Sequence, residues 1–145
     1  MRGRDLETTR RSIRRYRRIP LAILNFVEGT RFTQEKHDDQ ESPYRHLLRP
    51  RVGGVAFVLA SLGEQLDGVV DVTIAYPRPD ITVWELLTNR VERIVVRARC
   101  LEVPAEFLNN DITEPGPARD DFKQWIESLW TAKDKLLADI HTVVH

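Results

Sequence analysis

Apolar residues along this chain fall into short runs and periodic stretches that polar segments separate. Residues 21–26, LAILNF, are nearly all apolar and lie between Pro20 and Gly29. A run of this length without polar alternation is typical of a strand that is covered on both faces in a parallel sheet. A buried helical turn is the alternative, and the shortness of the run favours the strand.

Three further segments have clear preferences. Residues 53–66, GGVAFVLASLGEQL, are rich in Ala, Val and Leu, which predicts a largely buried helix. Residues 69–76, VVDVTIAY, have the β-branched content of a strand that stops before Pro77. Residues 93–101, RIVVRARCL, alternate enough to predict a strand with one exposed face.

A long amphipathic helix is predicted near the end of the sequence, with Asp120 and Asp121 as its N-terminal cap. Its apolar face follows the three- and four-residue spacing of a helix. The residues on this face are Phe122, Trp125, Ile126, Leu129, Trp130, Lys133, Leu136, Leu137 and Ile140. We expect both tryptophans to pack in the core.

The remaining segments complete the predicted order of elements. Residues 5–18 are rich in Arg and predict a helix that Pro20 stops. Residues 32–50 and 109–119 are predicted loops, and residues 84–89 a short helix or loop. The order helix, strand, helix, strand, strand, helix predicts an α/β fold with few strands, flanked by helices. So small a sheet has an edge that needs a partner.

Composition adds limits on the class of protein. The chain has 145 residues, is 41% hydrophobic and 30% charged, and has a formal net charge of zero, as expected of one globular domain. Cys100 is the single cysteine, which excludes an intramolecular disulfide, and we expect it to be a small buried residue. No secretory signal is expected, and the longest uncharged stretch, residues 52–63, is too short to span a bilayer.

The tetrapeptide Glu28-Gly29-Thr30-Arg31 directly follows the first apolar run. In α/β sheets, ligands bind beyond the carboxyl ends of parallel strands. Gly29 permits a sharp turn, Thr30 offers a hydroxyl, and the planar guanidinium of Arg31 matches phosphate oxygens. Glu28 could orient that guanidinium. The four residues therefore indicate a phosphate monoester site, and a structural Glu–Arg pair at a strand end is the alternative.

Residues 25–33, NFVEGTRFT, resemble the third conserved block of the lysophosphatidic acid and glycerol-phosphate acyltransferase family, whose core is Phe-x-Glu-Gly-Thr-Arg. Phe26 and the segment 28–31 fall on this pattern. Val27 stands where many members have Pro, a departure that leaves the polar groups intact.

Later segments resemble the same family in the same order. Residues 47–63 are similar to the segment after the third block, and residues 69–77 to the fourth block. Residues 122–137 are similar to the C-terminal helix of a bacterial subgroup. The resemblance implies one acyltransferase-like domain over residues 1–145, the C-terminal part of a longer domain with a partial acyltransferase-type sheet.

This resemblance implies that Arg31 binds the phosphate of the acceptor, and that Glu28, Gly29 and Thr30 shape its site. The implied reaction moves an acyl chain from acyl-coenzyme A or acyl carrier protein to a hydroxyl of lysophosphatidic acid or glycerol phosphate. In the family a His-x-x-x-x-Asp pair supplies the general base. Neither a metal nor a prosthetic group is implied as a cofactor.

The sequence contains no His-x-x-x-x-Asp pattern. The residues five places after His37 and His46 are Ser42 and Arg51, and the sequence ends before the fifth residue after His141. We therefore expect the chain to lack the catalytic residues of the family and to have little or no activity by itself.

Two groups of arginines are further candidates for anion contacts. Arg49 and Arg51 precede the predicted helix start at Gly53 and could assist in binding a phosphate or coenzyme group, with solvated loop side chains as the alternative. Residues 1–20 carry eight Arg, which could form a solvated face, contact anionic lipid or bind nucleic acid. Because the acceptor of the family is a lipid, we expect a peripheral position at the cytoplasmic face of a membrane.

The competing hypothesis is a non-catalytic module that binds lipid phosphates or a protein partner. Its exposed sheet edge would then pair with a missing half of the domain or with a second copy. A nucleic-acid partner is not expected, because the overall charge is balanced.

Overall fold

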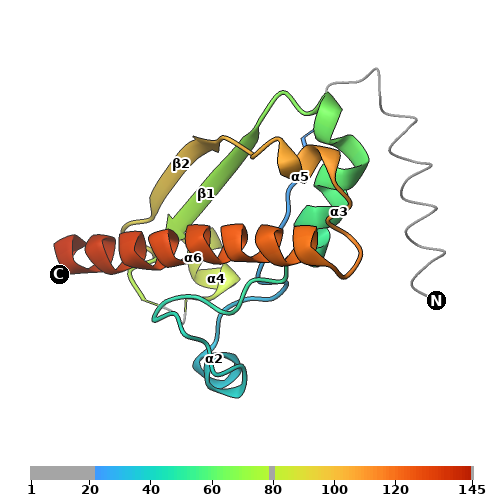
Figure 1. Cartoon of the computed structure of the whole chain (residues 1–145). Coiled ribbons are helices and arrows are strands. Elements are labelled where there is room, and N and C mark those ends of the chain that lie inside the picture. Colours follow the sequence, from blue (N-terminus) through green and yellow to red (C-terminus); the bar gives the residue numbers. More distant parts are fainter. Residues whose placement is uncertain (1–21, 79–80, 145) are drawn as a thin grey trace.

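The computed structural model describes residues 22–78 and 81–144 as a long helix, α6, that packs across a small sheet, with two of the shorter helices, α3 and α5, near one end of α6 (Figure 1). The helix predicted for residues 5–18 lies outside these residues. The elements are α2 (Gln34–Asp39), α3 (Gly53–Leu62), the 3-10 turn η1 (Gly63–Gln65), β1 (Val69–Ala75), α4 (Val83–Leu87), β2 (Val95–Leu101), α5 (Glu106–Asn109) and α6 (Pro117–Val144).

Within the described residues the sheet has two strands, β1 and β2, which pair antiparallel. Their register places Val69 opposite Leu101 and Ala75 opposite Val95. The strands predicted for residues 69–76 and 93–101 are confirmed to within two residues at each end. Of the two alternatives predicted for residues 84–89, a short helix or a loop, the structure has the short helix α4, where Thr82 and Glu85 form a reciprocal capping box.

Helix α6 supplies one side of the hydrophobic core along most of its length. Phe122, Ile126, Trp130 and Leu137 are all at most 8% exposed, which confirms the predicted apolar face. Burial of each such side chain contributes about 1.5–3 kcal/mol. The helix begins at Pro117, three residues before the predicted cap, because the fixed φ of proline suits the first turn of a helix.

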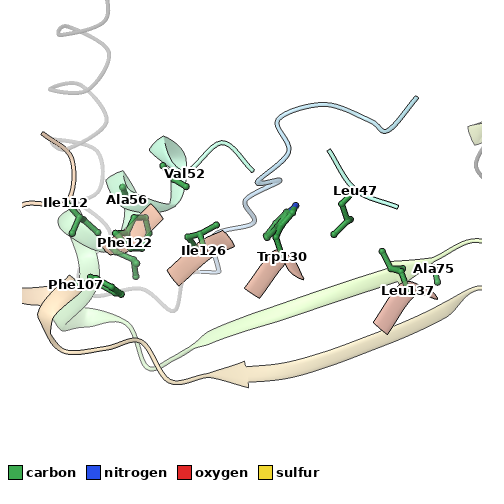
Figure 2. Close-up of a cluster of buried hydrophobic side chains, with 11 residues drawn as sticks. Leu47, Val52, Ala56, Ala75, Phe107, Ile112, Phe122, Ile126, Trp130 and Leu137 are labelled. Atoms are coloured by element: carbon green, nitrogen blue, oxygen red, sulfur yellow. The ribbon is translucent and has the colours of Figure 1, made fainter. Parts of the chain in front are cut away.

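The core cluster lies where α6 meets α3 and α5, and it continues along α6 toward β1 (Figure 2). The rings of Phe107, Phe122 and Trp125 lie with centroids 5.3–5.8 Å apart. Such tilted and edge-on contacts add to the energy of burial. The predicted core positions of Trp125 and Trp130 are confirmed.

The two faces of the sheet differ in polarity in an unexpected way. The inner face packs on α6 and carries Asp71, Thr73 and Arg99, whereas the outer face is apolar and exposed. The outer face consists of Val70, Val72, Ile74, Val96, Ala98 and Cys100. The expected burial of Cys100 is therefore wrong, because no described element covers this side of the sheet.

The strand predicted for residues 21–26 is wrong over the described part, residues 22–26, which form no ladder. Leu24 and Phe26 are 78% and 75% exposed. A strand requires a neighbour for its backbone N–H and C=O groups, and here the segment instead ends in a turn. The expected parallel arrangement is also absent from the described sheet.

The loop predicted for residues 32–50 contains helix α2, which is a second difference. Thr33 caps this helix by accepting a hydrogen bond from the Lys36 backbone N–H at 3.3 Å. The loop predicted for residues 109–119 is confirmed over residues 110–116, between the end of α5 and the start of α6. Among the described helices, none combines the length and apolar character that crossing a membrane requires.

Candidate functional site

The Glu28–Arg31 segment begins within a tight turn that is held against the start of α3. The Gly29 N–H donates to the Phe26 carbonyl at 2.8 Å, and Gly29 adopts φ +69°, a region that favours glycine. The Arg51 N–H donates to the Val27 carbonyl at 2.7 Å. A Cβ atom on Gly54 would lie 2.8 Å from the Asn25 side chain, so helix α3 also approaches this segment closely.

Glu28 is directed toward the protein and interacts with elements distant in sequence. Its half-buried carboxylate accepts a hydrogen bond from the Leu48 backbone N–H. Burial raises the pKa of Glu28 above 4.5, although the Leu48 hydrogen bond and the charge of Lys133 act in the opposite direction. No hydrogen bond or ion pair between Glu28 and Arg31 occurs within the described residues.

Helix α6 holds the loop that contacts Glu28. The indole Nε1–H of Trp130 donates to the Leu48 carbonyl at 3.1 Å. The carboxylate of Asp134 accepts from the backbone N–H groups of Arg45 and His46 at 2.9 and 2.7 Å. Two polar side chains one turn apart therefore fix the loop that in turn positions Glu28.

Thr30 and Arg31 lie on the outer side of the turn. The Arg31 side chain is exposed, and within residues 22–78 and 81–144 its guanidinium has no hydrogen bond or ion pair. The Thr30 hydroxyl accepts a hydrogen bond from Lys36 Nζ at 2.8 Å, and the same ammonium donates to the Arg31 carbonyl at 3.2 Å. These contacts leave the Thr30 hydroxyl proton and the Arg31 guanidinium available to a ligand.

The two accessory arginines differ in their surroundings. Arg49 donates from Nε to the Gln40 carbonyl and from Nη2 to the Glu41 carbonyl, each at 2.8 Å, so its guanidinium closes the loop after α2. Arg51 is exposed, and its stem lies beside the turn, with Cδ 3.0 Å from the position of a Cβ on Gly29. The structure therefore brings Arg51 to the turn.

Three histidines of the described residues, His37, His46 and His141, lie in structural contacts. His37 donates from Nε2 to the Tyr44 carbonyl at 2.6 Å, and its Nδ1 is 3.1 Å from Asp38. These two contacts raise the pKa of His37. His46 stacks on His141 with ring centroids 5.0 Å apart, and burial lowers the pKa of His46. Among the described residues, no three His, Cys, Asp or Glu side chains are grouped to hold a metal ion.

Sequence reasoning did not identify three residues that shape this site: Lys36, Lys133 and Asp134. The helical spacing places Lys133 on the apolar face of the last helix, and a lysine at such a position is itself a signal of a buried partner. Its ammonium group donates to Asp71 at 2.5 Å and to the Val72 carbonyl at 2.9 Å. No comparable signal in the sequence points to Lys36, because its hydrogen-bond partners are set by the way α2 folds back toward the turn.

Comparisons with known proteins identify relatives over most of the chain. The chain is 30% identical to 1-acyl-sn-glycerol-3-phosphate acyltransferase 2 of Brassica napus over 128 residues, covering 81% of this chain and 30% of that protein. It is 29% identical to lysocardiolipin acyltransferase 1 of Mus musculus over 136 residues, covering 84% of this chain and 33% of that protein. No family model matches the chain, and no solved structure matches it.

A shorter match has higher identity. The chain is 37% identical to lysocardiolipin acyltransferase 1 of Danio rerio over 73 residues, which is 42% of this chain and 18% of that protein. The chain spans about a third of the length of the plant and mouse relatives, 30% and 33%. These relatives do not favour the non-catalytic alternative.

Proposed function

This chain belongs to the lysophosphatidic acid and glycerol-phosphate acyltransferase family, and from that premise we propose that it serves acyl transfer in phospholipid synthesis. Its proposed part is to hold the phosphate of a lysophospholipid or glycerol-phosphate acceptor at the Glu28–Arg31 turn. The acyl donor in this proposal is a thioester, either acyl-coenzyme A or acyl carrier protein. The proposed setting is peripheral, at the surface of the membrane that contains the lipid acceptor.

The observation that carries the proposal is the exposed guanidinium of Arg31, which has no partner among the described residues. A guanidinium can donate two parallel hydrogen bonds to phosphate oxygens, and such charge-assisted bonds are about twice as strong as neutral ones. Arg51 lies beside the same turn and adds a second positive charge. Glu28 is turned toward Leu48, so its carboxylate does not neutralise Arg31.

Two groups at the turn complete the proposed phosphate contacts. The Thr30 hydroxyl already accepts a bond from Lys36, so its proton is free to be donated to a phosphate oxygen. Helix α3 begins at Gly53 without a side-chain cap, and its first backbone N–H groups favour an anion nearby. We assign Arg49 a structural part in this site, because its guanidinium already binds two carbonyls.

The chemical step requires a group that this chain does not contain in the family pattern. The acceptor hydroxyl oxygen attacks the thioester carbonyl while a base removes the hydroxyl proton, the new C–O bond forms, and the C–S bond breaks to release the coenzyme or carrier thiolate, which takes up that proton. No His-x-x-x-x-Asp is present, and both ring nitrogens of His37 have partners. We therefore propose that the 145-residue chain binds the acceptor and transfers acyl groups slowly or not at all.

Titration calorimetry with a short-chain lysophosphatidic acid tests the binding proposal. Arg31→Ala is expected to weaken binding about tenfold or more, because a charge-assisted hydrogen bond is lost. Arg93→Ala makes the same change of charge in the exposed connection before β2 and is the matched control. Equal affinities for wild type and Arg31→Ala would refute the assignment of the phosphate to this turn.

A turnover assay with acyl-coenzyme A and lysophosphatidic acid tests the remaining part. The isolated chain is expected to release thiol no faster than a buffer control. Rapid release that Arg31→Ala abolishes would show that a general base lies within these residues, and the proposal of an incomplete catalytic set would then be wrong.

A further inference from the structure

Lys36 occupies an unusual position beside the Thr30–Arg31 segment. It is half-buried, and its ammonium group donates to the Thr30 hydroxyl at 2.8 Å and to the Arg31 carbonyl at 3.2 Å. Both partners are neutral oxygens. Among the described residues Lys36 has no carboxylate within ion-pair distance, so its charge is not neutralised locally.

The fold orients the Lys36 side chain toward the protein, so that it does not extend freely into solvent. Thr33 caps α2 through the Lys36 backbone N–H, which places Lys36 in the first turn of the helix with its side chain directed back toward residues 30 and 31. The entropy of ordering a long side chain is thereby lost on folding, before any ligand binds. A lysine ordered in this way can bind an anion at little further entropic cost.

An ammonium group has three N–H donors, and the two described contacts use two of them. The third is left for a ligand. We propose that Lys36 is a binding residue of the acceptor-phosphate site, donating its third N–H to a phosphate oxygen while the other two hold Thr30 and Arg31 in place. This inference rests on the proposed function of the Glu28–Arg31 turn and adds a residue that the motif does not contain.

The charge of the proposed ligand supports this assignment. A phosphate monoester carries about −1.5 to −2 charges at pH 7. Arg31, Lys36 and Arg51 supply three positive charges around the turn, and the carboxylate of Glu28 points away from them. The site is therefore expected to prefer a dianionic monoester over a singly charged diester.

Calorimetric titration with glycerol 3-phosphate, its methyl phosphodiester and glycerol tests the inference. Lys36→Met is expected to weaken binding of glycerol 3-phosphate about tenfold or more, and to reduce the preference for the monoester over the diester. Lys36→Arg keeps the positive charge and is expected to retain affinity within about threefold of wild type. Lys123→Met, on the exposed side of α6, is the control for loss of one lysine.

Each outcome of these titrations either supports or overturns the proposed role of Lys36. Unchanged affinity and unchanged monoester preference in Lys36→Met, together with weakened binding in Arg31→Ala, would overturn the inference and leave the proposed function intact. A Lys36→Met affinity loss that is equal for monoester and diester, and that Lys36→Arg does not rescue, would show a purely structural residue and also overturn it. Failure of the wild-type chain to bind glycerol 3-phosphate more tightly than glycerol would overturn both proposals.

Discussion

The ammonium group of Lys133 on α6 lies 2.5 Å from a carboxylate oxygen of Asp71 on the inner face of the sheet. Their side chains are 8% and 13% exposed, and Arg99 contacts the second oxygen of Asp71 at 3.1 Å. The Lys133 charge also acts on Glu28. This pair therefore joins the long helix to the sheet, and its positive charge also acts to lower the pKa of Glu28.

Removal of Lys133 should destabilise the fold strongly. Lys133→Met leaves Asp71 without its closest cation in a mostly dry interface, at an expected cost of about 3 kcal/mol in the free energy of unfolding. Urea titration measures this change. The control is Lys123→Met on the same helix, whose exposed pair with Glu127 spans 3.7 Å and should contribute less than about 1 kcal/mol. Equal effects of the two substitutions would contradict the importance of the buried pair.

Substitution of Gly29 should damage the turn itself. Gly29→Ala places a Cβ at φ +69° and 3.0 Å from Cδ of Arg51. We expect a loss of about 1–2 kcal/mol in unfolding free energy together with weaker acceptor binding. Gly68→Ala is the matched control, because no atom lies within 4 Å of its added Cβ. A Gly29→Ala protein as stable as Gly68→Ala would show that the turn tolerates a side chain.

The raised pKa of Glu28 predicts a pH-dependent effect on stability. Burial raises this pKa above the ordinary value of 4.5, so the folded state favours the protonated carboxyl. The contribution of Glu28 to stability is full below pH 4.5 and is lost as the pH rises through its folded-state pKa. Glu28→Gln should therefore be more stable relative to wild type at pH 7 than at pH 4. A difference in unfolding free energy that is constant across this range would contradict the prediction.

The exposed outer face of the sheet predicts self-association. Val72 and Val96 are 43% and 52% exposed within a continuous apolar face, and such faces bind one another or another protein. Light scattering should detect species larger than a monomer as the concentration rises. Val72→Lys should shift the population toward monomer, whereas Gln124→Lys on the exposed side of α6 should not. A wild-type chain that stays monomeric at all concentrations would refute this prediction.

The turn motif and the elements with strong periodicity could be predicted from the sequence. The spacing of apolar residues in α6 and the β-branched content of β1 are local properties, and both elements formed where they were expected. Residues 22–26 were predicted wrongly, because an apolar run forms a strand only when a second strand supplies hydrogen-bond partners. Helix α2 was missed because its polar sequence has no apolar periodicity, although Thr33 provides a cap.

The order of amino acids alone places Glu28 to Arg31 at the turn, because these residues are consecutive and a glycine suits the left-handed backbone at Gly29. The directions of their side chains depend on tertiary packing. Glu28 turns inward because Trp130 holds Leu48, a contact between residues 82 positions apart, and Lys133 reaches Asp71 across 62 positions. Contacts over such separations depend on how helices and strands pack in three dimensions, which the periodicity of a single segment does not encode.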